Sequence, residues 1–203
     1  MQKITLIIKN INVAFAHKKS LLAAVTEEQR NKALKFKFEE DQIRSLISSS
    51  LMSALSKEPV LYKENGKPYF ANGPYFNISH SGDYVIMAVA NKEVGVDIEK
   101  NKPKDMSMLL KIFNEAEAKM IKEHADFYYL WCAKESLIKC IGGSINHIKE
   151  IPSLPLNGLK TFKGKDYQCK TFIYQDHIIS ITLEGNEEFE VIVNEKNTFP
   201  ITI

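Results

Sequence analysis

The chain contains 203 residues, of which 44% are hydrophobic and 26% are charged, proportions that are ordinary for a globular protein. Such a chain can bury a substantial core as one domain or as two small, tightly packed domains. Its formal net charge of +2 is too small to indicate a protein that binds nucleic acid or a membrane surface.

The first 93 residues are expected to form one α+β half. Apolar runs predict strands, and apolar residues three and four apart predict helices. Thr26 and Gln29 have the spacing of a capping box, and Asn65-Gly66 has the composition of a hairpin turn. The expected elements are, in order, strands at residues 3–8 and 11–16, helices at 26–36 and 39–55, a hairpin at 60–70 and a strand at 84–90.

Residues 94–203 are expected to form a second α+β half. It begins with a strand at 94–98 and a lysine-rich linker at 100–105. Asn114 and Glu117 mark a helix start, and Gly142-Gly143 ends a longer helix as a C-cap does. The other expected elements are helices at 114–123 and 126–141, a loop at 151–158, and strands at 167–174, 178–183 and 189–193. Each half therefore contains helices followed by strands.

Cysteine usage and the absence of long apolar runs indicate a cytoplasmic protein. Cys132, Cys140 and Cys169 are odd in number and lack the spacing of metal ligands, so we expect reduced thiols. The apolar run at residues 4–8 fits a strand and not a signal peptide. No stretch approaches the roughly 20 apolar residues that a membrane-spanning helix needs.

Two short stretches carry residues suited to metal and phosphate chemistry. In Gly95-Val96-Asp97-Ile98-Glu99 the two carboxylates alternate along a strand and project to the same face. Glu135 and Lys139 are four apart in a predicted helix and share one helix face. Magnesium prefers oxygen ligands, and lysine is a point charge that suits phosphate. The pattern therefore favours a hard cation that holds a phosphate chain.

Each of these residues also has a plainer interpretation. Asp97 and Glu99 could lie on a solvated strand edge, although the very apolar strand just upstream favours burial. Glu135 could be only the helical ion-pair partner of Lys139, but its helix is apolar on several sides, which favours a buried partner or a ligand. For Lys134, packing and a phosphate contact both remain open.

The same stretches resemble the signatures of the 4′-phosphopantetheinyl transferases, specifically the larger surfactin-type group. That family has a G-(V/I)-D-(I/V)-E strand followed by (F/W)-x-x-K-E-(S/A)-x-x-K, and residues Trp131 to Lys139 fill every fixed position of the second pattern. Asn77-Ile78-Ser79-His80-Ser81 resembles the family's N-(I/L)-S-H-S element, and Gly66-Lys67-Pro68 resembles its G-K-P turn. The four matches occur in the expected order over most of the chain.

The resemblance implies an α+β fold built as a pseudo-twofold pair of similar halves, with the active site in the cleft between them. It implies Mg²⁺, with Mn²⁺ as an alternative, held by Asp97, Glu99 and Glu135. Lys139 is expected to bind the diphosphate of coenzyme A, the co-substrate. Trp131, one turn before Glu135, is expected to pack in the core and fix this helix, with a substrate platform as its alternative role.

The resemblance also implies contacts to coenzyme A from the first half. Ser79 and His80, expected in a loop that enters the strand at 84–90, match the element that contacts its phosphates, although a lone histidine is usually structural. Gln29 occupies a position where the family often has a basic residue, so fewer basic residues are expected around the nucleotide than is usual in the family. The residues that fall where the family binds the 3′-phosphate and nucleotide are Lys32, Arg44, Ser45 and Lys67; from spacing alone the first three would be ordinary helix surface.

The implied reaction is transfer of 4′-phosphopantetheine from coenzyme A to a serine of an acyl or peptidyl carrier protein, releasing 3′,5′-ADP, by a cytoplasmic monomer. Glu135 is the first choice for the general base and Glu117 the second, with a metal-ordered water as a further option. Two alternatives remain: a non-catalytic module that binds coenzyme A or a carrier protein, and a Mg²⁺-dependent phosphodiesterase. Segment 105–121 carries more apolar side chains than one short helix face can hide. They could all pack into the core, or they could form the carrier-docking surface, with Lys100, Lys102, Lys104 and Lys111 steering the carrier protein.

Overall fold

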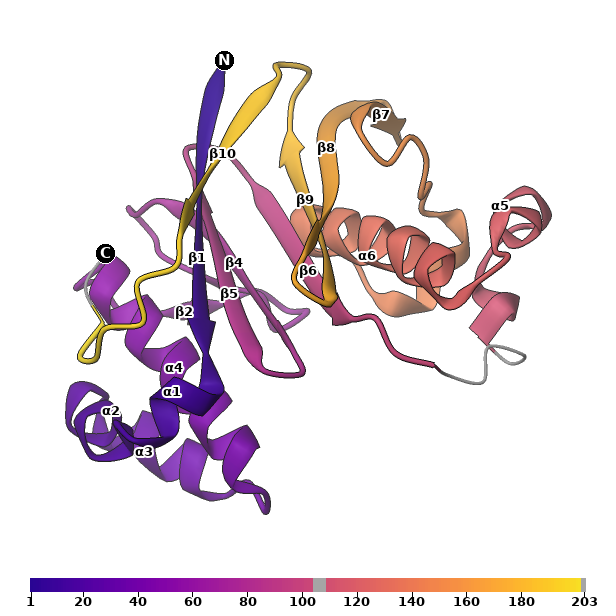
Figure 1. Cartoon of the computed structure of the whole chain (residues 1–203). Coiled ribbons are helices and arrows are strands. Elements are labelled where there is room, and N and C mark those ends of the chain that lie inside the picture. Colours follow the sequence, from indigo (N-terminus) through magenta and orange to yellow (C-terminus); the bar gives the residue numbers. More distant parts are fainter. Residues whose placement is uncertain (104–108, 202–203) are drawn as a thin grey trace.

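Figure 1 shows the computed structural model of the chain, which describes residues 1–103 and 109–201. The first half contains β1 (Gln2–Asn10), α1 (Ile11–Phe15), α2 (Lys18–Ala24), α3 (Glu27–Leu34), α4 (Glu39–Leu55), β2 (Leu61–Tyr62), β3 (Pro68–Tyr69), β4 (Tyr75–Ser81) and β5 (Tyr84–Ala90). The second half contains β6 (Val94–Lys100), η1 (Leu109–Ile112), α5 (Glu115–Met120), α6 (His124–Ile141), η2 (Ile145–Glu150), β7 (Gly158–Phe162), β8 (Lys165–Tyr174) and β9 (His177–Glu184). The last strand is β10 (Phe189–Asn194).

The long strands form two four-stranded sheets. The first sheet has the order β10-β1-β5-β4, and the second has the order β6-β9-β8-β7. Strands β2 and β3 pair with each other as the predicted hairpin. Strand β10 runs parallel to β1, with Phe189 opposite Gln2, so the end of the chain returns from the second half to the sheet of the first.

The two sheets share an apolar core and carry helices on their outer faces (Figure 1). Strand alternation explains this layering, because successive side chains point to opposite faces. On β1, Ile4, Leu6 and Ile8 enter the core between the sheets, whereas Ile7 faces the helices. The expected α+β fold of two similar halves is confirmed, since each four-stranded sheet packs against helices, and β10 of the second half completes the first sheet.

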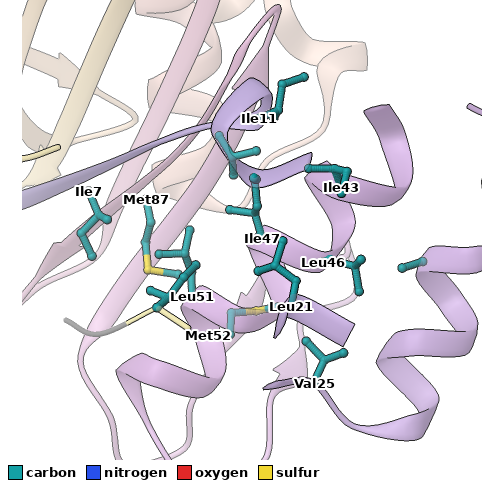
Figure 2. Packing of buried hydrophobic residues seen from close by; sticks show 14 of the residues in the cluster. Ile7, Ile11, Leu21, Val25, Ile43, Leu46, Ile47, Leu51, Met52 and Met87 are labelled. Atoms are coloured by element: carbon teal, nitrogen blue, oxygen red, sulfur yellow. The ribbon is translucent and has the colours of Figure 1, made fainter. Parts of the chain in front are cut away.

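Helix α4 is the centre of the packing on the first sheet, as Figure 2 shows. Its residues Ile43, Leu46, Ile47 and Leu51 are fully buried and recur three and four apart, which places them on one helix face. They pack against side chains from α1, α2, β1 and β5, including Met87. The bounds predicted for this helix agree with the structure.

The predicted strand at residues 11–16 is wrong, because this segment forms helix α1. The side chain of Asn10 caps the helix by accepting a hydrogen bond from the Asn12 amide at 2.8 Å. Ile11 and Ala14, three residues apart, are the buried ones. A short apolar run is compatible with strand or helix, and here the cap and the packing against α4 decide.

Of the other local predictions, some are confirmed and some are wrong. The Thr26–Gln29 capping box is present, and Gly142 ends α6 in a left-handed conformation at φ 69°. The segment before Tyr84, expected as a loop that carries His80, is instead strand β4 paired with β5. Helix α2 and strand β7 were not predicted.

Cys132, Cys140 and Cys169 are free and buried. This agrees with the expectation of reduced thiols. Within the described parts of the chain, every helix is too short or too polar to cross a membrane.

Candidate active site

The first motif lies where strand β6 meets helix α6 at close range. A Cβ atom on Gly95 would lie 2.0 Å from the Ser136 carbonyl oxygen and 2.4 Å from the Cys140 nitrogen. Only glycine permits this approach of helix to strand. Val96 and Ile98 enter the core between the sheets, so the alternating Asp97 and Glu99 face away from that core, toward α6.

Strand β4 of the first half completes a small polar cluster with these residues. Lys139 Nζ lies 2.6 Å from Asp97 Oδ1 and donates to Ser79 Oγ at 3.0 Å. The Ser79 hydroxyl in turn donates to Asp97 Oδ1 at 2.9 Å. One step along both strands, the Ser81 hydroxyl donates to Glu99 at 2.8 Å. The cluster therefore joins the two halves.

A cavity of about 310 Å³ opens beside this cluster. It adjoins a second hollow of about 310 Å³ along the β2–β3 turn, and Ile78, Glu135, Lys139 and Ile145 line both. The other residues that line the first cavity are Ser79, His80, Asp97, Glu99 and Trp131. The structure thus brings together six predicted site residues from β4, β6 and α6: Ser79, His80, Asp97, Glu99, Glu135 and Lys139.

Burial and repulsion from neighbouring carboxylates shift the pKa values of Glu99 and Glu135 upward. Burial, followed by the charges of Asp97 and Glu99, raises the pKa of Glu135 to about 6, with Lys139 opposing. Burial and Asp97 likewise raise the pKa of Glu99. For Lys139, burial is outweighed by Asp97 and Glu135, and its pKa is raised.

His80 lies at the exposed end of the cluster. Partial desolvation and the positive charges of Arg44 and Lys139 lower its pKa, although its side chain is solvent-exposed. Trp131 lines the cavity and also stacks on Phe127, with ring centroids 6.1 Å apart and an interplanar angle of 11°. Trp131 therefore packs against Phe127 and also forms part of the cavity wall.

Two carboxylate oxygens in the cavity wall, Asp97 Oδ2 and Glu135 Oε1, are buried without a hydrogen-bond partner. Buried charged oxygens are normally satisfied, so these atoms call for a ligand. Within the described residues, however, no three His, Cys, Asp or Glu side chains are gathered closely enough to hold a metal ion. The donor chemistry fits a magnesium-like cation whose shell is completed by phosphate and water, because such ions take few protein ligands.

Glu117, expected as the alternative base, occupies a different place. It is 3% exposed on α5, and its Oε1 accepts hydrogen bonds from the amide and hydroxyl of Ser153 at 3.0 and 2.6 Å. Its Oε2 accepts from the Asn114 amide at 3.1 Å and pairs with Lys134 at 2.9 Å. Burial raises its pKa, but the hydrogen bonds from Ser153 and Lys134 outweigh burial and lower it overall. This environment argues against a base and identifies a structural ion pair, which also assigns Lys134 to packing.

Lys67, expected at the 3′-phosphate, is also engaged elsewhere. It is 7% exposed, and its ammonium group donates to Glu93 at 2.7 Å, to the Val94 carbonyl at 3.0 Å and to the Cys140 carbonyl at 3.2 Å. All three of its N–H groups are therefore used. This arrangement argues against a phosphate contact and shows that Lys67 ties the β2–β3 hairpin to β6 and α6.

The remaining candidates for the nucleotide are dispersed. Arg44 donates to Asp41 at 2.7 Å and to the Gly82 carbonyl at 2.7 Å, so it holds the β4–β5 turn next to His80. Lys32 is exposed on α3, 5.6 Å over the ring of Tyr62, in a separate hollow. Ser45 is half-buried on α4.

Ser81 is the polar side chain at the site to which the sequence patterns assigned no role. The sequence did contain a signal for Ser81, because Asn77, Ser79 and Ser81 alternate and share one strand face. The expectation of a loop in this segment concealed that alternation. Asn77 uses the same face to accept a hydrogen bond from the Val96 amide at 2.9 Å.

Two family models match successive parts of the chain. The model described as "4'-phosphopantetheinyl transferase, N-terminal" matches residues 14–92, and that of the "4'-phosphopantetheinyl transferase superfamily" matches residues 93–188. A 4′-phosphopantetheinyl transferase of Bacillus subtilis is 33% identical over 192 residues, which cover 85% of this chain and 83% of that protein.

Two further relatives bear similar names. The 4′-phosphopantetheinyl transferase Sfp of Bacillus subtilis strain 168 is 34% identical over 173 residues, covering 77% of this chain and 74% of that protein. The 4′-phosphopantetheinyl transferase gsp of Aneurinibacillus migulanus is 30% identical over 186 residues, covering 84% and 74%. Together with the motifs and the fold, these matches place the chain in the 4′-phosphopantetheinyl transferase superfamily, to which it belongs as an enzyme.

Proposed function

We propose that this protein transfers the 4′-phosphopantetheine arm of coenzyme A to a serine of an acyl or peptidyl carrier protein and releases 3′,5′-ADP. The single observation that carries the proposal is the cluster at the junction of the halves. There Lys139 and Ser79 meet Asp97 beside two unpartnered carboxylate oxygens. The names of the relatives support the same reaction class.

Asp97, Glu99 and Glu135 line one cavity but do not form a preformed metal cluster, so they would close around Mg²⁺, or Mn²⁺ in its place, with phosphate and water completing its shell. When bound, such an ion neutralises the charge that develops on a diphosphate during phosphoryl transfer. Burial, followed by repulsion from neighbouring carboxylates, raises the pKa values of Glu99 and Glu135, and a cation would relieve the repulsion.

Lys139 and His80 would bind the diphosphate of coenzyme A. Lys139 is 27% exposed and points its ammonium group into the cluster, so it can turn from Asp97 toward a phosphate oxygen. The carrier serine oxygen then forms a bond to the pantetheine-bearing phosphorus. The bond from that phosphorus to the bridging oxygen breaks, and the oxygen leaves with 3′,5′-ADP.

Glu135 would accept the proton of the carrier serine. Without a cation its pKa is raised to about 6, which still leaves this carboxylate mainly ionised at neutral pH and able to accept a proton. Its Oε1 has no hydrogen-bond partner and lies in the cavity wall. A water ordered in the same site remains the alternative acceptor. Glu117 does not take this role, because it lies in the buried ion pair with Lys134.

A mass measurement tests the proposal. Purified protein, Mg²⁺ and coenzyme A are incubated with an apo carrier protein, and with a carrier whose acceptor serine is alanine as the control. We expect the mass of the arm to be added only to the serine carrier, with one 3′,5′-ADP released per transfer. Coenzyme A binding without a mass gain would indicate a binding module, and coenzyme A cleavage without carrier would indicate a phosphodiesterase.

We further propose that Arg44, Lys32 and Ser45 serve the nucleotide end of coenzyme A, with Arg44 as the member closest to the site. The Arg44 contact to the Gly82 carbonyl sets it next to His80, at the edge of the cavity. We expect dephospho-coenzyme A to bind less tightly than coenzyme A in calorimetry. Equal affinities for the two cofactors would indicate that these residues do not contact the 3′-phosphate and are only surface or structural residues.

Carrier docking along segment 105–121 also stays a proposal. Lys104, Met106 and Met108 lie outside the described residues. Of the others, Phe113 is buried, and Lys100 pairs with Asp83 and Asp176 at 3.1 and 3.3 Å. Among the described residues of this group, Lys102, Lys111 and Met120 are exposed and available to a partner.

A further inference from the structure

We propose that His177 is a positioning residue for the candidate active site, which holds the β4–β5 turn so that the Ser81 hydroxyl stays on the Glu99 carboxylate. Ser81 and His177 lie 96 residues apart in the sequence and in different halves. The inference rests on the proposed function, in which Glu99 is one of the carboxylates that hold the cation.

His177 is completely buried at the start of β9, where it pairs in register with Lys100 of β6. Its ring packs edge-on against Tyr84, with centroids 4.9 Å apart. Nε2 lies 3.2 Å from the Ser81 carbonyl oxygen. Nδ1 lies 2.7 Å from Asp176 Oδ1, without the alignment of a hydrogen bond. Because a carbonyl can only accept, Nε2 must carry the hydrogen that joins His177 to Ser81.

Ser81 converts this contact into a constraint on Glu99. Its hydroxyl accepts a hydrogen bond from the Lys100 amide at 3.1 Å, which leaves the hydroxyl proton for Glu99 Oε2 at 2.8 Å. The direction of the hydroxyl is thereby fixed. Any shift of the Ser81 backbone would lengthen the bond to Glu99, so the His177 contact acts on the carboxylate through Ser81.

The turn itself is tightly held between two elements. Gly82 has φ +52°, and a Cβ atom there would lie 2.8 Å from His177 Nε2 and 2.9 Å from Lys100 Cδ. On the other side, Arg44 of α4 donates to the Gly82 carbonyl at 2.7 Å. The far end of the interface between the halves is tied independently by Lys67. Loss of the His177 contact should therefore move the turn and leave the halves joined.

Two isosteric variants separate positioning from packing. The amide nitrogen of His177→Gln can replace Nε2 and keep a donor toward Ser81, whereas that of His177→Asn replaces Nδ1 and leaves the Ser81 carbonyl without a donor. Mn²⁺ uptake is measured by electron paramagnetic resonance with saturating coenzyme A and no carrier protein, and stability is measured by urea unfolding. We expect Mn²⁺ affinity about 10-fold lower for His177→Asn and near wild type for His177→Gln.

Ser81→Ala removes the bond to Glu99 directly and should lower Mn²⁺ affinity by a similar factor. Because both changes act through one hydrogen bond, we expect the double variant Ser81→Ala/His177→Asn to be no weaker than Ser81→Ala. Lys165→Met is the control. It removes an exposed ion pair to Glu184 at 3.1 Å, at the end of β9 far from His177 and the β4–β5 turn, so it should leave Mn²⁺ affinity unchanged.

The proposal is overturned if His177→Asn binds Mn²⁺ as wild type does, if the effects of Ser81→Ala and His177→Asn add in full, or if wild-type protein takes up no Mn²⁺. If His177→Asn does not fold, wild-type Mn²⁺ affinity in Ser81→Ala overturns it instead, and a loss there, with His177→Gln intact, supports it. Failure of the proposed function is a separate result: the wild-type protein would then bind Mn²⁺ with these dependences but add no arm to the carrier.

Discussion

Helix α6 carries the lysines of two lysine–carboxylate pairs, which differ in whether the carboxylate oxygens are satisfied. Lys134 and Glu117 lie 2.9 Å apart, and every carboxylate oxygen of that pair has a partner. Lys139 and Asp97 lie 2.6 Å apart, but Asp97 Oδ2 and the neighbouring Glu135 Oε1 have none. Both lysines belong to the same family motif. Both carboxylates are buried, so satisfaction of the acceptors, and not burial of the carboxylate, separates the structural pair from the candidate active site.

Removal of Asp97 should give the greatest change, and it acts on catalysis. Asp97→Ala should reduce transfer at least about 100-fold, since it removes both a proposed cation ligand and the anchor of Lys139. The free energy of unfolding without metal should hold or rise, because repulsion of Glu99 and Glu135 is relieved. Rates at saturating Mg²⁺ and urea unfolding measure the two quantities. Near-wild-type rates for both Asp97→Ala and Glu135→Ala would refute the mechanism.

The structural pair should show the reverse pattern. Lys134→Met leaves the buried Glu117 charge without its counter-ion and should lower the free energy of unfolding by about 3 kcal/mol or more. Lys139→Met, on the same helix, is the comparison and should cost less stability, because its ammonium group is partly exposed and the neighbouring Glu99 and Glu135, whose pKa values are raised, can bind a proton in its place. Urea unfolding of both variants decides. Equal losses would erase the distinction between the pairs.

The two carboxylates should also give opposite pH dependences of stability. The folded pKa of Glu135, about 6, exceeds its ordinary value of 4.5, so the folded state binds the proton more tightly. Without metal, its contribution must therefore stabilise the protein as pH falls from about 7 toward 4.5. The pKa of Glu117 is lowered, so its contribution to stability has the opposite pH dependence. That contribution is lost as pH falls through the lowered pKa.

Urea unfolding at pH 7 and pH 5.5 in wild type, Glu135→Gln and Glu117→Gln measures these contributions. Relative to wild type, Glu135→Gln should gain stability at pH 7 and lose that advantage at pH 5.5. Glu117→Gln should be less stable than wild type at both values. A constant difference between wild type and Glu135→Gln across this range would contradict the raised pKa.

The smallest expected effect is on the association of the enzyme with the carrier protein. Charge reversal at Lys102 and Lys104 should raise the apparent KM for the carrier protein several-fold and leave that for coenzyme A unchanged, because steering acts on association. The effect should fade with added salt. Charge reversal at Lys163, an exposed lysine of the β7–β8 turn, is the control. An unchanged KM in the double variant would move the docking surface elsewhere.

Features that depend on neighbouring residues were predictable from the sequence. The bounds of α4 follow from its apolar spacing, and the caps at Thr26 and Gly142 follow from local chemistry. The faces of Asp97, Glu99, Glu135 and Lys139 follow from strand and helix periods. The short segment at residues 11–16 shows the limit, because its pattern allows strand or helix and packing against α4 decides.

Periodicity and spacing are local properties, so they were enough to establish the α+β class, the family motifs and which polar residues share a face. Which lysines reach the cavity depended on the packed structure. Lys67 and Lys134 match family motifs as well as Lys139 does, but their ammonium groups are taken by carbonyls 73 and 17 residues away. The pairing of β10 with β1 and the meeting of Ser81 with Glu99 and His177 likewise appeared only in the folded chain. Contacts across such separations depend on how the two halves pack, which no local pattern specifies.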